Sequence, residues 1–154
     1  MVSRFRNDAG SIIVEFALSV SVFCVALIAV VEFSRLMYAW GSAAEGTRRA
    51  ARLATTCSIS AQTEAAIRAR VRPFVVSSGQ VDLGTRTDWL VISYLPAGCT
   101  SETCTVVEAR LNAVQPKLAI PFVSGSVTLP PFPVRLPREA MRTSTSDGAN
   151  PACA

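Results

Sequence analysis

A continuous apolar run near the N-terminus constrains this chain more than any other feature of its sequence. Between Ser11 and Val31 the only charged residue is Glu15. As an α-helix the run would be about 31 Å long, at about 1.5 Å per residue, which matches the hydrocarbon thickness of a bilayer. A helix buried in a protein core usually carries a polar stripe, whereas polar positions are few here. The run therefore predicts a membrane-spanning helix.

The single carboxylate in this run needs a physical reason. A charged side chain at the centre of a membrane helix costs about 2.5–3.5 kcal/mol on insertion scales, so it usually has a partner or a function. Glu15 lies near the start of the run, only five residues after Gly10. An alternative is that Glu15 lies at the level of the lipid head groups, with residues 11–14 outside the hydrocarbon.

Composition limits the functional classes that remain. The chain has 154 residues, a mean hydropathy of +0.37 and a formal net charge of +4, which is enough for one membrane element and one small domain. It contains no histidine, which excludes histidine-based triads, general bases and metal ligands. Nucleotide-binding and nucleophile motifs are absent, and Lys117 is the only lysine. We therefore expect neither an enzyme nor a bound cofactor.

Five cysteines divide into one in the apolar run and four beyond it. Cys24 is interpreted as a small apolar residue. The other four predict two disulfides in an oxidising compartment, with Cys99 and Cys104 clasping a loop and Cys57 and Cys153 tying the tail to the first helix. Four cysteines allow three pairings, and reduced thiols remain an alternative. Zinc is disfavoured, because no second close pair accompanies the Cys-x4-Cys spacing.

The helical pattern continues past the apolar run. Glu45 and Arg49 are spaced i, i+4 in the favourable order, and a thin apolar seam follows the helical repeat. The seam consists of Leu36, Ala39, Ala43, Ala50 and Leu53. We expect one helix from about Ser11 to about Ala54, with Gly41 and Gly46 as positions where it can bend.

A second helix and several strands are expected after this point. The second helix spans about 61–72, with Ser60 as its N-cap and Pro73 at its end.

The segment "DWLVISYL" predicts a buried strand. In "TVVEARLNAV" Val107, Ala109, Leu111 and Ala113 alternate with polar residues. The segments "GSVTL" and "PVRLPREAMR" are further strand candidates, restricted by prolines to edges or loops. The fold class is α+β, a long N-terminal helix with a second helix and a short antiparallel sheet.

The far end of the apolar run has the character of a membrane interface. Glu32 and Arg35 are spaced i, i+3 and predict an interfacial ion pair where the helix leaves the membrane. Tyr38 and Trp40 follow, and aromatic rings favour this region.

The residues around Glu15 resemble the processing site of type IV prepilins and pseudopilins. In "AGSIIVEF" a glycine ends a short basic leader, and Glu15–Phe16 stand at the fifth and sixth positions after it. The segments that follow are "GSIIVEFALSVSVF", "EFSRLMYAW", "AAEGTRRAARLA" and, at the end of the sheet, "AMR". This pattern resembles the TadE-like family of minor pseudopilins, which serve the tight-adherence (Flp type IV pilus) machinery. The resemblance covers about Arg6 to Arg142 and is strongest over residues 10–54.

The resemblance implies a processing route and a set of partners. A membrane prepilin peptidase would cut between Gly10 and Ser11, and Glu15 would pair with the new amino group of a neighbouring subunit. The implied partners are this peptidase, the major Flp pilin, other minor pseudopilins, the inner-membrane pilus platform and membrane lipid. The expected organisation is a leader over 1–10, a helix over 11–54, an extracytoplasmic domain over 55–142 and a tail over 143–154. Methylation of Ser11 and the subunit's position in the pilus are left open.

The charges that flank the run conflict over its orientation. Arg4 and Arg6 precede it, whereas Arg35 and the three arginines of residues 48–52 follow it. A simple count under the positive-inside rule places the C-terminal domain in the cytoplasm. The cysteines and the prepilin resemblance place it outside. Because residues 48–52 lie at least 17 residues beyond Val31, where the rule weakens, we expect the domain outside the inner membrane.

Three alternatives remain. The chain can be an anchored extracytoplasmic domain with a cell-envelope binding role and an uncut N-terminus. It can be a secreted protein cut near "GSA" at residues 41–43. The arginine clusters at 48–52 and 68–72 can bind nucleic acid, but only Phe74 supplies an aromatic ring nearby. A solvated helix face or a subunit contact is the favoured interpretation of these arginines.

Overall fold

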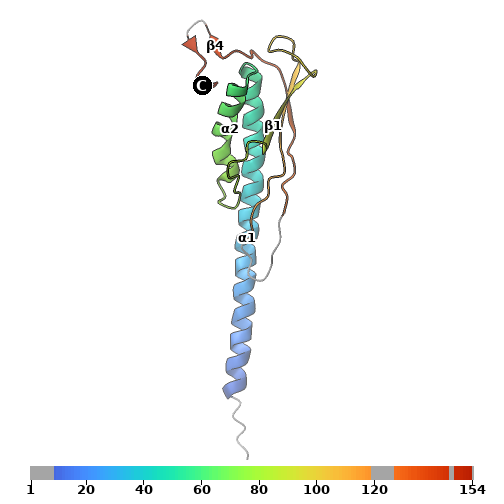
Figure 1. Ribbon diagram of the computed structural model, residues 1–154. Coiled ribbons are helices and arrows are strands. Elements are labelled where there is room, and N and C mark those ends of the chain that lie inside the picture. Colours follow the sequence, from blue (N-terminus) through green and yellow to red (C-terminus); the bar gives the residue numbers. More distant parts are fainter. Residues whose placement is uncertain (1–8, 119–126, 146–147, 154) are drawn as a thin grey trace, which may run out of the picture.

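The N-terminal helix carries a small head domain on the half that is distant from the N-terminus. The computed structural model describes residues 9–118, 127–145 and 148–153. Helix α1 runs without interruption over Ala9–Thr56, about 72 Å at about 1.5 Å per residue. In Figure 1 α2 and β1 flank the upper part of α1 on different sides, and the lower part extends alone. The expected continuous helix and the α+β class are confirmed.

The head contains a three-stranded antiparallel sheet in the order β1-β2-β3 and a small second hairpin. The strands are β1 Leu90–Leu95, β2 Val106–Leu111, β3 Val134–Pro137, β4 Ser144–Thr145 and β5 Gly148–Ala149. In the register of the sheet Ile92 lies opposite Ala109, and Glu108 lies opposite Arg135. Strand β3 pairs only with β2, so its proline at the end of the strand lies on an edge, as expected.

The alternation predicted for β2 is confirmed, with one exception. Val107, Ala109 and Leu111 are buried and Arg110 is exposed. Ala113 was expected to continue the buried face, but it is exposed and has a φ of 48°. The strand ends at Leu111, and the left-handed backbone at Ala113 turns the chain away from the sheet, so the period of two no longer applies.

Small residues on α1 allow the head to pack closely against it. Ala43, Ala50, Ala51 and Ala54 are fully buried among residues of α2 and the sheet. A Cβ at Gly46 would lie 3.2 Å from Cγ2 of Val75 and 3.3 Å from Cγ1 of Val71. Helix α1 continues through Gly41 and Gly46, the two positions where it could bend, and Gly46 provides room for α2.

Helix α2 covers Ala61–Val76 and is longer than predicted. Ser60 is its N-cap, as expected, and its hydroxyl accepts a hydrogen bond from the Thr63 backbone N–H at 3.1 Å. The prediction that Pro73 ends the helix is wrong. Val75 is fully buried in the core, and the ring of Phe74 lies beneath Arg49. These tertiary contacts stabilise one more turn despite the hydrogen bond that a proline removes.

The structure confirms the remaining predicted strands only in part. Of "GSVTL", residues 125–126 lie outside the described residues, and 127–129 form no strand. Only residues 134–137 of "PVRLPREAMR" form one. The C-terminal segment is not a loose tail, because β4 and β5 pair within it and a disulfide joins it to the end of α1.

Burial of Tyr94 on β1 has a measurable consequence. Its hydroxyl oxygen is buried and has no hydrogen-bond partner among the described residues. Burial is the main cause that raises the pKa of Tyr94 to about 12, and the nearby Glu64 carboxylate adds to it. Because the folded-state pKa exceeds the ordinary value of about 10, this residue lowers stability as the pH rises from about 10 to about 12.

We predict that Tyr94 titrates near pH 12 in the folded chain and near pH 10 in denaturant, as measured by tyrosinate absorbance. The chain has two tyrosines, so a Tyr38→Phe background leaves Tyr94 alone. Tyr94→Phe removes an unpaired buried hydroxyl and is expected to leave the free energy of unfolding unchanged or to raise it by up to about 1 kcal/mol. A loss of more than about 1 kcal/mol would show that the hydroxyl has a partner.

Candidate functional site

The proposed cleavage position lies in the first turn of α1. The helix begins at Ala9, so the bond between Gly10 and Ser11 is already within it. The leader residues 1–8 lie outside the described residues. Gly10 is exposed, and a Cβ at this position would meet nothing within 4 Å. Packing among the described residues therefore gives no reason for a glycine here.

The apolar run presents its side chains outward over its whole length. The run from Gly10 is long and apolar enough to cross a membrane, and none of it is buried by described residues. Phe16 and Val22 are 68% and 71% exposed. Contiguous apolar surface of this size marks a membrane or protein contact. The Ser21 hydroxyl donates to the Ala17 carbonyl at 2.7 Å, so this polar group is satisfied within the helix, as a lipid environment requires.

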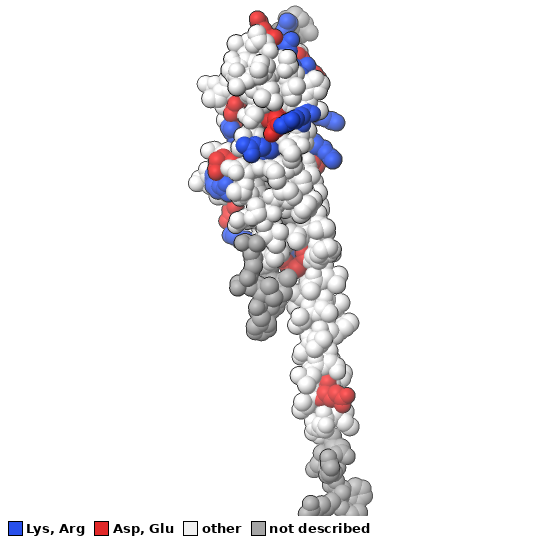
Figure 2. All heavy atoms as spheres, turned by 90° about the vertical axis from the view of Figure 1, so that its right-hand side faces the viewer, with Lys and Arg blue, Asp and Glu red and all other residues white. Residues whose placement is uncertain are grey.

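Glu15 is an isolated charge on this surface. Its side chain is exposed, and it makes no ion pair or hydrogen bond with a described residue. In Figure 2 the exposed lower helix is almost entirely uncharged apart from a single acidic patch, and the blue Lys and Arg atoms gather on the head. Phe16 follows Glu15 and is likewise exposed. Both side chains are thus open to lipid or to another subunit.

A buried polar contact fixes the head to α1 just beyond the apolar run. Glu32 is 5% exposed, and Arg35 Nη1 lies 2.7 Å from its Oε1. Gln80 Nε2 donates to Glu32 Oε2 at 3.0 Å, and Gln80 is itself buried. Because a buried carboxylate needs charge and hydrogen-bond partners, this contact holds the loop after α2 against the helix. The sequence predicted the i, i+3 pair but not Gln80, since nothing local marks a partner 48 residues away.

Of the two aromatic residues just past the apolar run, Trp40 contacts the head and Tyr38 is exposed. The ring of Trp40 packs edge-to-face on Phe132, with 5.4 Å between centroids, and Trp40 remains 40% exposed. Tyr38 is 59% exposed. Both rings therefore present surface at the level where the head begins.

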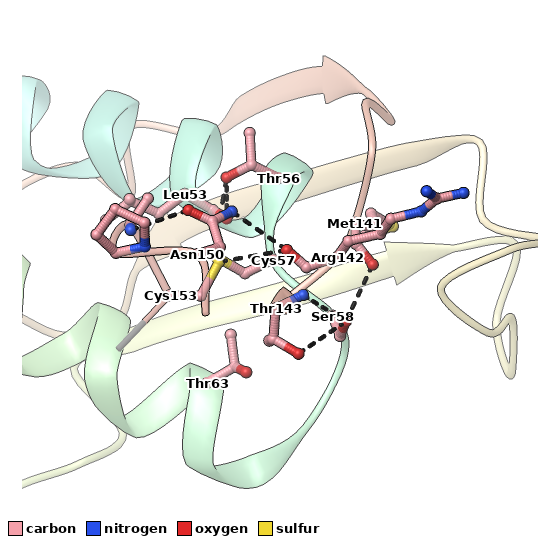
Figure 3. Close-up of a disulfide and its surroundings, with 12 residues drawn as sticks. Leu53, Thr56, Cys57, Ser58, Thr63, Met141, Arg142, Thr143, Asn150 and Cys153 are labelled. Carbon is pink, nitrogen blue, oxygen red and sulfur yellow. Dashed lines mark hydrogen bonds between the residues drawn. A yellow bond between two sulfur atoms is a disulfide. The ribbon is translucent and has the colours of Figure 1, made fainter. Parts of the chain in front are cut away.

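Two disulfides close the head at the end distant from the apolar run. Cys57 pairs with Cys153, and Cys99 pairs with Cys104 in the loop between β1 and β2. In Figure 3 Cys57, at the end of α1, lies beside the C-terminal residues Asn150 and Cys153. The Ser58 hydroxyl donates to the Met141 carbonyl at 3.0 Å and supports the same junction. Cys24 is a free, exposed thiol on α1.

The described part of the chain contains no cluster of cysteine and acidic side chains that could hold a metal ion. The described residues offer three surfaces for contact. These are an apolar helix with one carboxylate, a buried polar junction at Glu32, and a disulfide-closed head with exposed arginines.

A single long helix, apolar in its first half, carries a small α+β head on its far half. The model of the family described as TadE-like protein matches residues 10–52. This match covers most of α1 and confirms the resemblance to the TadE-like family over residues 10–52. The match implies a pilin-like protein associated with a Tad pilus.

The match ends within α1, so the rest of the head lies outside it. Neither the curated proteins nor the solved structures contain a match to this chain. The apolar helix suggests membrane anchoring, and the two disulfides suggest that the head is extracytoplasmic.

Proposed function

We propose that this protein is a non-catalytic minor pseudopilin of a tight-adherence pilus or secretion apparatus. A prepilin peptidase removes residues 1–10, and the mature chain begins at Ser11 with the apolar part of α1 in the inner membrane and the head outside. The observation that carries the proposal is the position of Glu15, five residues after Gly10 at the start of an exposed apolar helix, within the TadE-like match.

The proposed cleavage explains the carboxylate in the apolar run. Cleavage creates a positively charged α-amino group on Ser11, one helical turn from Glu15. In a bundle of packed helices Glu15 pairs with the amine of a neighbouring subunit, and an intramembrane charge is tolerated when it has such a partner. The pair also sets the register of helices that otherwise have little directional preference in lipid. The exposure of Glu15 supports this role.

The proposed partners are the prepilin peptidase, the major Flp pilin, other minor pseudopilins and the inner-membrane platform. Helix contacts would use the alanines and serines of the apolar run, whose small side chains allow close approach. The head, closed by its disulfides, would supply the contacts that distinguish this subunit from the others.

The N-terminal mass of the protein from a membrane fraction tests the proposal, with and without the cognate peptidase. We expect a chain that starts at Ser11 only when the peptidase is present. A chain that still starts at Met1 would indicate an anchored extracytoplasmic domain without processing. A start near Ala44 would indicate a secreted protein, with Glu15 removed along with its signal.

A further inference from the structure

A hollow between α1 and α2 is lined by more arginines than acidic residues. We name it the basic hollow, and it has a volume of about 460 Å³. Its lining consists of Glu45, Arg49, Arg52, Leu53, Arg70, Val71 and Phe74. Three guanidinium groups thus face one carboxylate over an apolar floor. The volume is within the range of about 300–1,000 Å³ that is typical of ligand sites.

Two arginines share one acid at the basic hollow, unlike in the other ion pairs of the head. The other head ion pairs of the described chain join one cation to one acid, as in Arg86–Asp88, Lys117–Asp82 and Arg135–Glu108. At the basic hollow Arg49 lies 2.9 Å and Arg48 4.0 Å from the same Glu45 carboxylate. The hydrogen bond from Arg49 is the main cause that lowers the pKa of Glu45, and the charges of Arg48 and Arg52 lower it further.

Contacts within the chain position two of the arginines. The guanidinium carbon of Arg49 lies 4.0 Å from the centre of the Phe74 ring, and its Nε bonds Glu45 at 2.9 Å. Arg70 donates to the carbonyl oxygens of Pro151 at 2.6 Å and Ala152 at 3.1 Å. The side chain of Arg52 makes no hydrogen bond or ion pair with a described residue. Side chains that are already held in place lose less conformational entropy when the hollow binds a ligand.

We propose that the basic hollow binds an acidic peptide segment of a partner protein outside the membrane. Its carboxylates would bind Arg52 and the adjacent arginines, because a guanidinium matches a carboxylate in a bidentate geometry. An apolar side chain between the acids would lie on Leu53 and Val71. The inference names the partner chemistry of the head and rests on the proposed function for placing the head outside the membrane.

Two other anionic ligands fit the hollow less well. Glu45 lies 14 residues beyond Val31, about 21 Å along the helix at about 1.5 Å per residue, so lipid head groups at the end of the run do not reach it. Single-stranded nucleic acid needs open aromatic faces for base stacking. The only ring in the hollow is Phe74, and Arg49 covers one face of it.

Fluorescence anisotropy of the full-length chain in neutral detergent micelles tests the inference. The probe is a labelled peptide Ac-EELEE-NH2, and the matched control is Ac-QQLQQ-NH2. We expect the acidic peptide to bind at least about tenfold more tightly than the control and to weaken as salt rises from about 50 to about 300 mM. Arg52→Glu should weaken it by about tenfold or more, whereas Arg110→Glu, the same charge change at an exposed position of β2, should not.

Three outcomes would overturn the inference. One is equal binding of the two peptides, and another is an equal effect of Arg52→Glu and Arg110→Glu. The third is tighter binding of a short poly-dT strand than of the acidic peptide, which would assign the hollow to nucleic acid. Peptide binding by the purified chain does not depend on leader cleavage, so an uncut N-terminus would contradict the proposed function and leave this measurement unaffected.

Discussion

Replacing Glu15 by glutamine is expected to leave cleavage after Gly10 unchanged and to reduce incorporation of the mature chain into pilin assemblies by about tenfold or more. Glutamine keeps the shape of the side chain and removes its charge, so the pair with a neighbouring Ser11 amine is lost. An interhelical polar contact in a membrane is worth about 1–2 kcal/mol, and about 1.4 kcal/mol corresponds to a tenfold change. No described residue of the same chain offers Glu15 another partner.

The measurement is the ratio of major pilin to mature chain after affinity purification from detergent extracts, together with the N-terminal mass in the same sample. Glu102→Gln is the matched control, because this glutamate is exposed on a loop of the head and far from the apolar run in sequence. Unchanged incorporation of Glu15→Gln would place the carboxylate at the head-group level without a role in assembly. Loss of cleavage in the same variant would assign Glu15 to recognition by the peptidase.

Removing the Cys57–Cys153 disulfide is expected to destabilise the head far more than removing Cys99–Cys104. The first bridge joins residues 96 apart in sequence and the second joins residues 5 apart. On the loop-entropy scale these correspond to about 4–5 and about 2 kcal/mol of stabilisation. The first bridge also anchors the segment whose carbonyls accept hydrogen bonds from Arg70. A few hydrogen bonds of about 1 kcal/mol each are too weak to replace the stabilisation that this disulfide provides.

Urea unfolding of the two double-alanine variants in neutral detergent checks this order. The chain has two tryptophans, and Trp89 is 2% exposed in the head. A Trp40→Phe background therefore makes fluorescence a probe of Trp89 alone. Equal losses of stability, or a larger loss for Cys99→Ala/Cys104→Ala, would contradict the prediction. Wild-type protein treated with reductant should lose at least as much stability as either variant.

Local signals in the sequence determined α1, the start of α2, the main strand and the resemblance to the TadE-like family. The apolar run, the Ala-rich continuation and the i, i+4 pairs are all periodic within one helix, so α1 could be predicted almost to its ends. The alternation of buried and exposed side chains in β2 and the N-cap at Ser60 also depend on residues that are close in sequence. The Gly10 and Glu15 spacing is also local, and it led to the TadE-like family.

Contacts between distant segments decided the rest. Pro73 stays within α2 because Val75 and Phe74 pack on α1, and Gly46 is needed because α2 approaches there. Burial of Glu32 depends on Gln80, 48 residues away, and the basic hollow exists only where α1 meets α2. No local period encodes such a pairing, since its energy comes from burial and hydrogen bonding across the fold. The sequence by itself thus determined the extent of the N-terminal helix, and the tertiary structure decided which surfaces the head presents.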